Sequence, residues 1–225
     1  MSTAIYLTWM QTYLSADELN EPLYLKVARA CKRMSRAALL KETDLGAQYS
    51  LNSHILADPT RAVWGECGSI SRHAVEVIKA FGGFAELVNL DKTCTDATFD
   101  GHVAIRMSIG GRTMFLDPLY GSFFGTTGDP WELKKALKRK AKSESITYVD
   151  IEPYEAALGG YQSINLLSFQ SIIDNYLNMI RLRDDIGGPG NGENIIALVT
   201  TSDTNKIDPA RVAALWSNSS VFLLQ

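Results

Sequence analysis

One stretch of the chain, residues 102–118, predicts its own strand pairing. In HVAIRMSIGGRTMFLDP, apolar and polar residues alternate on both sides of Gly110-Gly111, a pattern typical of two antiparallel strands joined by a two-residue turn. Such a turn places Ile109 opposite Arg112. Every other pair then follows, because a one-residue slip would turn each side chain to the other face. This hairpin restricts the fold more than any other segment does.

The two faces of the hairpin differ in character. One face is expected to be core, because it carries apolar residues throughout: Val103, Ile105, Met107, Ile109, Met114 and Leu116. The other face carries His102 and Asp117 as diagonal neighbours, about 7–8 Å apart between backbones and within side-chain reach. The carboxylate could accept the ring N–H of the histidine and fix its tautomer, which is the task of the third member of a catalytic triad.

The rest of the pattern places helices before antiparallel strands, which indicates an α+β fold. Helices are expected at 16–42, at 68–81, from Asp129 as N-cap to about 142, at 168–184 and from Asp208. Strands are expected at 84–90, 146–151, 195–201 and 221–225.

The length fits a single domain spanning residues 1–225. We expect a helical N-terminal part over about 1–82, a β-rich core over about 84–151 and a C-terminal α/β extension over about 152–225. The glycine-rich run at 187–192 is interpreted as a flexible loop, too short to link two domains.

Composition argues against several functional classes. The chain is 46% hydrophobic and 21% charged with a net charge of −3, which suits a folded core and gives no general attraction to nucleic acid or membrane. No apolar run approaches the ~20 residues of a membrane span, and the first ten residues lack the pattern of a signal peptide. Three cysteines without CxxC spacing argue against a disulfide framework and a zinc site. We therefore expect a reduced, cytoplasmic protein without a metal or cofactor.

The cysteines have different surroundings. Cys67, in GECGSISRHAVEVIKAFGG, begins a predicted helix, where the positive end of the helix dipole favours a thiolate. Cys31 lies on the apolar stripe of the first long helix and is expected in the core. Cys94 lies in a predicted loop between Asp91 and Asp96, whose charges raise the pKa of a thiol. Cys67 is therefore the candidate nucleophile, the alternative being a small residue packed at a tight helix entrance.

The histidines can be compared in the same way. His73 follows Cys67 on one helix but is turned about 120° away and lies some 9 Å along it, so it cannot pair with the thiol. His54 lies at a predicted loop or helix end without an evident partner. His102 has Asp117 beside it and is therefore the candidate base.

Residues 60–121, about a quarter of the chain, resemble the core of the transglutaminase-like superfamily of papain-related thiol enzymes. The similar segments are GEC at the start of a helix, GGFAELVNL after it, and GHVAIRM and FLDPLYG on successive strands. The resemblance implies a papain- or transglutaminase-like core with N-terminal helices packed on an antiparallel sheet. It also implies a triad of Cys67 as nucleophile, His102 as general base and acid, and Asp117 as the residue that orients the histidine.

The resemblance leaves the reaction open within the superfamily. Arylamine N-acetyltransferases share the triad but usually have Arg-Gly-Gly before the cysteine, where this chain has RAVWG. Animal transglutaminases have Gly-Gln-Cys-Trp, where Glu66 and Gly68 flank Cys67 here.

The implied activity is acyl transfer through a covalent acyl-enzyme, from a small-molecule or peptide acyl donor to an amine acceptor. A cysteine protease or amidase of the same fold is the first alternative, and a non-catalytic binding module that keeps the fold is the second. The backbone N–H of Cys67, with Trp64 as a candidate second donor, could hold the oxyanion.

Other features have two interpretations each. Arg106, on the same face as His102, could bind a substrate carboxylate or be a surface residue. A basic helical face could be solvated or could dock an acidic carrier protein; its residues are Lys135, Lys138, Arg139 and Lys142. Three aromatic residues could line an acyl pocket or pack in the core: Phe123, Phe124 and Trp131.

Overall fold

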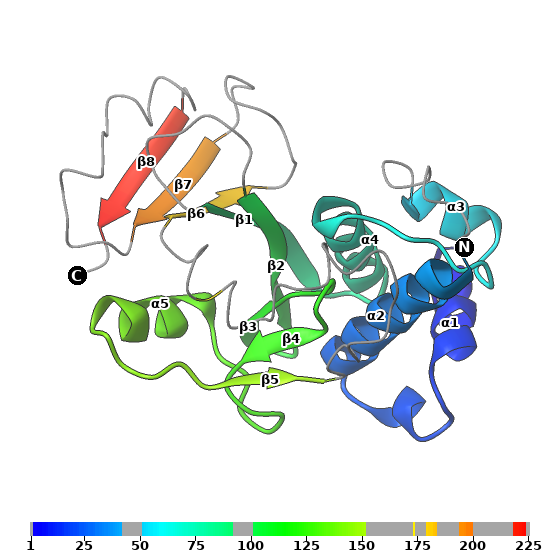
Figure 1. Ribbon diagram of the computed structural model, residues 1–225. Coiled ribbons are helices and arrows are strands. Elements are labelled where there is room, and N and C mark those ends of the chain that lie inside the picture. The colour runs from blue at the N-terminus through cyan, green and yellow to red at the C-terminus, as the bar shows by residue number, and fades with distance from the viewer. Residues whose placement is uncertain are drawn as a thin grey trace.

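The computed structural model describes residues 2–41, 51–91, 101–151, 173, 179–183, 194–199 and 218–223. Cys94, the glycine-rich run at 187–192 and the helix expected from Asp208 lie outside the described residues. The chain is a mixed α+β protein (Figure 1). Its helices are α1 (Ser2–Tyr13), the short 3₁₀ helix η1 (Glu18–Asn20), α2 (Leu23–Lys41), α3 (Leu51–Ala57), α4 (Cys67–Ala80) and α5 (Leu133–Ala141).

The described strands form two sheets. The larger has six strands in the order β3-β2-β1-β6-β7-β8, antiparallel except for the parallel pair β7–β8. Its strands are β1 (Phe84–Asp91), β2 (Gly101–Ile109), β3 (Arg112–Leu116), β6 (Met179–Arg183), β7 (Asn194–Val199) and β8 (Asn218–Leu223). The smaller sheet pairs β4 (Ser122–Phe124) with β5 (Tyr148–Asp150). The C-terminal part of the chain thus extends the sheet that the central hairpin begins.

The hairpin forms in the predicted register. β2 and β3 pair from Ile109–Arg112 to Ile105–Leu116 around Gly110-Gly111. Both glycines have positive φ, +58° and +79°, the conformation that a two-residue turn of this kind requires and that residues with a Cβ rarely adopt.

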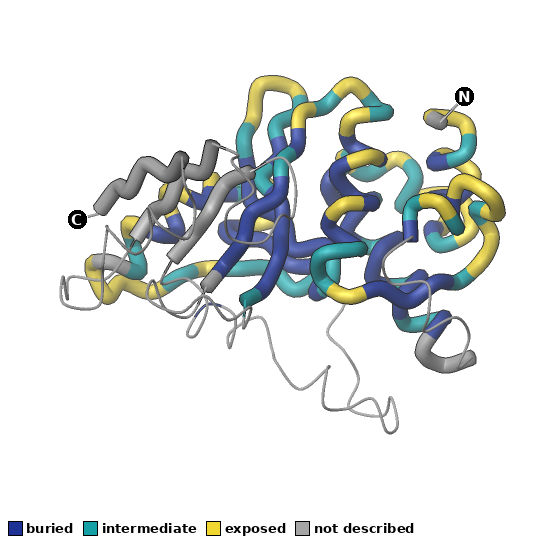
Figure 2. The backbone as a smooth tube through the Cα atoms, turned by 90° about the horizontal axis from the view of Figure 1, so that it is seen from above, coloured by how far each residue is buried: buried dark blue, intermediate teal, exposed yellow. Residues whose placement is uncertain are grey.

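Buried residues cover both faces of the sheet near the hairpin. On one face, Val103 and Ile105 pack with residues of helices α1 to α4, as the apolar pattern predicted. On the other face, Ala104 and Phe115 pack against Trp131 and other residues at α5. Figure 2 shows these buried segments meeting in the middle of the molecule. The face that carries His102 is therefore also packed, whereas only the opposite face was expected to be core.

Three expected elements need correction. The expected helix at 16–42 is divided, because Pro22 restricts Glu21 to an extended conformation and α2 begins only at Leu23. Asp129 does not cap α5; it closes a turn with Thr126, and Glu132 is the N-cap. The helix expected at 168–184 is wrong over its last part, where residues 179–183 form β6.

Three further elements, α1, α3 and β4, were not predicted as such. α1 is apolar around much of its circumference, so it lacks the periodic stripe that indicates a helix, and β4 has only three residues. None of the described helices combines the length and the apolar character needed to cross a membrane.

Candidate active site

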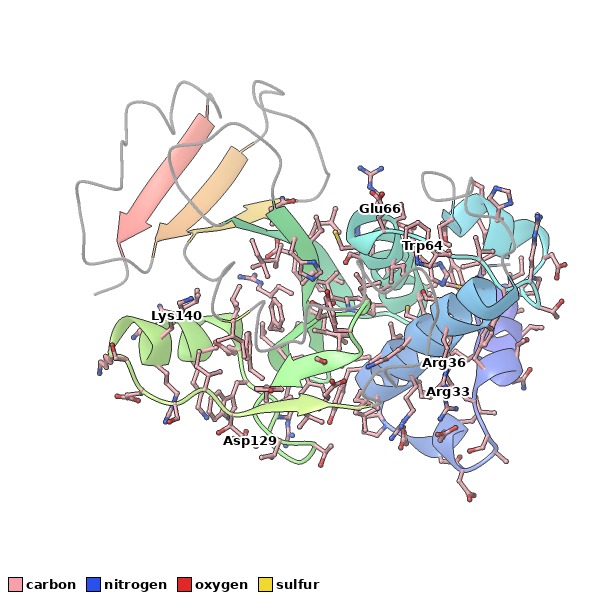
Figure 3. The ribbon with its side chains drawn as sticks, viewed as in Figure 1. Arg33, Arg36, Trp64, Glu66, Asp129 and Lys140 are labelled. Atoms are coloured by element: carbon pink, nitrogen blue, oxygen red, sulfur yellow. The ribbon has the colours of Figure 1, made fainter. Side chains whose placement is uncertain are left out.

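Helix α4 places Cys67 at its first residue. Glu66 is the N-cap with extended backbone, and its side chain makes no capping hydrogen bond. The first N–H groups of a helix have no partner within the helix, so they remain directed toward the region in front of Cys67. Figure 3 labels Glu66 and Trp64 in the segment that leads into this helix. The Cys67 side chain is partly exposed, unlike that of Cys31.

The hairpin brings His102 and Asp117 into contact. His102 Nε2 lies 2.5 Å from Asp117 Oδ2, and both side chains are buried. The register predicted this proximity. Because Nε2 is occupied by the carboxylate, Nδ1 is the ring nitrogen left for the Cys67 thiol, which hydrogen-bonds the His102 side chain.

The end of strand β3 exposes the backbone of β2 to helix α4. The β2–β3 pairing described above stops at Ile105–Leu116, and beyond it Asp117 turns away to bridge Ser122. The Ser71 hydroxyl donates to the Val103 carbonyl at 3.0 Å. The Val103 backbone also hydrogen-bonds the Cys67 sulfur. Cys67 and Ser71, one helical turn apart, thus occupy backbone groups that no longer pair with β3.

The charges of this site stabilise each other. Burial is the largest influence on the pKa of Cys67 and raises it, but the hydrogen bond and charge of His102, with the Val103 backbone, outweigh burial and hold the pKa below its ordinary value. Burial also opposes the charged form of His102 and therefore lowers its pKa. The charge and hydrogen bond of Asp117, together with Cys67, outweigh burial and raise the pKa of His102 to about 10. Both shifts favour the charged pair, a thiolate beside an imidazolium, over the neutral pair.

Asp117 has hydrogen-bond partners for both carboxylate oxygens. While Oδ2 faces His102, Oδ1 accepts from the backbone N–H groups of Leu119 and Tyr120, each at 3.1 Å. The Tyr120 ring also contacts His102, with 5.5 Å between ring centroids. The turn after β3 therefore fixes both the carboxylate and the imidazole.

Trp64 and Arg106, the two other predicted site residues, have neighbours that do not belong to the triad. Trp64 is buried and packs with Ala38 in a small cluster before α4. The Arg106 guanidinium lies 2.8 Å from the Glu86 carboxylate, its cross-strand neighbour on β1. Arg106 thus already has a carboxylate partner within the protein.

The alternative histidine and cysteine residues lie away from the site. Cys31 is buried in the core, as expected. His73 is also fully buried, and its Nδ1 lies 2.9 Å from the amide oxygen of Asn52. His54 is partly exposed in α3.

Of the aromatic residues, Phe124 and Trp131 pack with residues of α5, whereas Phe123 packs with the core on the α1–α4 side. Phe123 and Phe124 are fully buried, so they belong to the core. Trp131 is nearly buried beneath the cationic groups of Lys135 and Arg139, at 4.2 and 5.4 Å from its ring centroid. The basic residues of α5 line a shallow hollow on the surface.

Tyr120 and Lys32 are the site neighbours that sequence reasoning missed. The Lys32 ammonium donates to the Tyr120 carbonyl at 2.6 Å, although 88 residues separate them. The sequence did contain a signal for Tyr120. It lies three residues after Asp117, and an aspartate side chain often accepts hydrogen bonds from the backbone N–H groups of the turn that follows it. The sequence contained no signal for Lys32, because α2 carries several other basic residues and nothing in the pattern distinguishes Lys32 from them.

Among the described residues, His, Cys, Asp and Glu side chains form no group of three or more that could hold a metal ion. Comparisons of the chain with protein-family models, curated proteins and solved structures find no match, so the site is interpreted from its own geometry.

Proposed function

We propose that the chain is a thiol-dependent acyl transfer enzyme with a papain- or transglutaminase-like core. The observation that carries the proposal is the arrangement of Cys67, His102 and Asp117: a thiol at a helix N-terminus, bonded to an imidazole whose other nitrogen lies 2.5 Å from a buried carboxylate. Nucleophile, base and orienting group in this sequence of contacts are the components of covalent acyl transfer.

In the first step, the Cys67 thiolate attacks the carbonyl carbon of an amide, ester or thioester. A sulfur–carbon bond forms and the carbonyl electrons move to oxygen. The uncapped N–H groups at the start of α4, including that of Cys67, are suited to hold this oxyanion, with Trp64 as a candidate second donor. His102 then gives its Nδ1 proton to the leaving group as the bond to that group breaks, which leaves an acyl thioester on Cys67.

In the second step, an amine attacks the thioester and forms an amide. Neutral His102 takes the proton from the amine nitrogen, and Cys67 leaves as a thiolate. Asp117 supports both steps without changing its own protonation, because its bond to Nε2 keeps Nδ1 directed at the sulfur. Water in place of the amine would give hydrolysis, the reaction of a protease or amidase.

The acyl donor is proposed to be a small molecule, a peptide or an acyl group on an acidic carrier protein. The carrier alternative is favoured by α5, where Lys134, Lys138 and Lys142 follow one another at i, i+4 spacing on the exposed surface. α5 packs on the same face of the sheet as Phe115 and Tyr120, and the Tyr120 ring contacts the histidine.

Trapping the acyl-enzyme tests the proposal. The protein is mixed with a panel of short acyl thioesters and activated esters, quenched in acid, and analysed by intact mass and peptide mapping. We expect an acyl adduct on Cys67 and none on Cys31, and no adduct in Cys67→Ala. Adding primary amines to the trapped adduct then separates transfer from hydrolysis by the product formed.

Failure of every donor to acylate Cys67, in a protein whose thiolate still reacts with iodoacetamide, would favour the binding-module alternative. An adduct that forms and is released only to water would favour the hydrolase.

A further inference from the structure

A buried lysine lies behind the candidate triad. Lys32, on α2, is only 3% exposed, and its ammonium donates to the Tyr120 carbonyl at 2.6 Å and to Asp150 Oδ1 at 2.9 Å. A buried ammonium is costly unless it is paired and hydrogen-bonded, and Lys32 meets this condition through Tyr120 and Asp150. Tyr120 connects this lysine to the candidate triad.

Tyr120 contacts three parts of the site through three different groups. Its N–H donates to Asp117 Oδ1 at 3.1 Å, its ring contacts the imidazole of His102, and its carbonyl accepts from Lys32. The Tyr120 carbonyl lies in the peptide plane that follows the residue, whereas its N–H lies in the plane before it. The Lys32 contact therefore holds the turn on one side of Tyr120 while Asp117 holds it on the other. Loss of the Lys32 contact would let the backbone dihedral angles of Tyr120 change and so shift its N–H and ring relative to Asp117 and His102.

Gly121 and Ser122, the next two residues of the turn, also support the contact between Lys32 and the Tyr120 carbonyl. Gly121 has φ of +60°, and a Cβ there would lie 2.9 Å from Lys32 Cδ, so glycine allows α2 to approach the turn. The Ser122 hydroxyl donates to the Tyr120 carbonyl at 3.1 Å and is also 3.3 Å from Asp150 Oδ1. Helix, turn and strand β5 thus meet at one ammonium.

We propose that Lys32 is a positioning residue for the thiol site: paired with Asp150, it fixes the turn of residues 117–122 so that Asp117 and Tyr120 hold His102 against Cys67. The inference rests on the proposed triad but not on the acyl transfer reaction. It predicts that Lys32 affects the ionisation of Cys67 although it touches neither the sulfur nor the imidazole ring.

The test is the pH dependence of Cys67 alkylation by iodoacetamide in the full chain, with a thermal melt recorded for each variant. Lys32→Met keeps the length of the side chain and removes the ammonium. We expect its alkylation curve to shift about one pH unit upward, which is about a tenfold slower reaction below the thiol pKa. Asp150→Asn, at a side chain that is 30% exposed, should shift the curve in the same direction by less and should fold even if Lys32→Met does not.

Arg33→Met is the matched control. Arg33 is the next residue on α2 (Figure 3), and it pairs with Glu18 at 2.6 Å and donates to the Tyr13 carbonyl at 2.8 Å, away from the turn. Its loss removes the same charge from the same helix, so we expect a lower melting temperature and an unshifted alkylation curve.

Unshifted curves for folded Lys32→Met and Asp150→Asn would overturn the proposal and leave Lys32 a structural residue only. An equal shift in Arg33→Met would overturn it as well, because a general charge effect would then explain the result. The acyl-trapping experiment can fail independently, since alkylation reports the thiolate and not the transfer reaction.

Discussion

Two cysteine–histidine pairs lie in different regions: Cys31 and His73 in the helical layer of α2 and α4, and Cys67 and His102 at the sheet edge beyond the end of β3. Their pKa values shift in opposite directions. In the helical layer, burial raises the pKa of Cys31 far above its ordinary value and lowers the pKa of His73 to about 3. At the sheet edge, the pKa of Cys67 is lowered and that of His102 is raised to about 10. The same two kinds of side chain are therefore shifted toward the neutral form in one region and toward the charged form in the other.

For the two histidines, which are both buried, the difference comes from the partners and not from the depth of burial. His73 hydrogen-bonds the amide oxygen of Asn52 and packs edge-to-face with the rings of Tyr6 and Trp9, so no charge among the described residues compensates an imidazolium there. His102 has the Asp117 carboxylate on one nitrogen and the Cys67 thiol at the other. Desolvation acts on both histidines, and only a charged partner reverses it.

The largest expected effect is on turnover of any acyl donor that labels Cys67. Cys67→Ala and His102→Ala should each lower kcat by at least about 10³-fold, while Asp117→Asn should lose less, because a thiol ionises more easily than a hydroxyl. The double variant Cys67→Ala/His102→Ala should be no worse than Cys67→Ala, since the residues act as one unit. Steady-state kinetics, read beside melting curves, measure the order.

Full loss of activity in folded Asp117→Asn, with most activity kept in Cys67→Ala, would contradict the thiol mechanism. The pocket would then have to act as a carboxylate site.

The next effect concerns the two described cysteines. At neutral pH a limiting amount of iodoacetamide should modify Cys67 at least about 100-fold faster than Cys31, because only the thiolate reacts and Cys31 is both neutral and buried. We expect Cys67 to react before Cys94 also. Peptide mapping by mass spectrometry gives the order, and first labelling at Cys94 with Cys67 untouched would exclude Cys67 as the nucleophile.

A smaller effect should follow from exchanging the partners of the two histidines. Asp117→Asn gives His102 the amide partner that His73 has, so the pKa of His102 should fall from about 10 and Cys67 alkylation at pH 6 should slow about tenfold. Asn52→Asp gives His73 a carboxylate, so its pKa should rise from about 3. Titration of the imidazole signals by NMR measures both shifts. An unchanged His102 in Asp117→Asn would mean that the carboxylate does not set its charge.

Much of the site followed from local pattern. The register around Gly110-Gly111 placed His102 beside Asp117, and the glycine-flanked cysteine at a helix start placed Cys67, because both patterns depend on residues close in sequence. Strand β6 did not follow, because MIRLR becomes a strand by pairing with the open side of β1, a partner about 90 residues away. The contact of Lys32 with Tyr120 is equally distant in sequence.

The smallest effect isolates the helical layer through acid stability. Between about pH 6.5 and 3, the unfolded chain binds a proton at His73 that the folded chain excludes, so this residue contributes stability above pH 6.5 that is lost as pH falls. One such proton corresponds to a slope of about 1.4 kcal/mol per pH unit. The lowered pKa of Cys67 acts on the stability in the same direction. The comparison is therefore made in a Cys67→Ala background.

In that background, His73→Phe keeps an aromatic ring against Trp9 and removes the titrating group, at the cost of the bond to Asn52. We expect a lower free energy of unfolding at pH 7 but a shallower decline toward pH 4 than in the parent, as measured by urea unfolding at several pH values. Parallel declines for the two proteins would mean that His73 is protonated in the folded state. Burial without a charged partner would then not be what separates the two regions, and the contrast with His102 would need another cause.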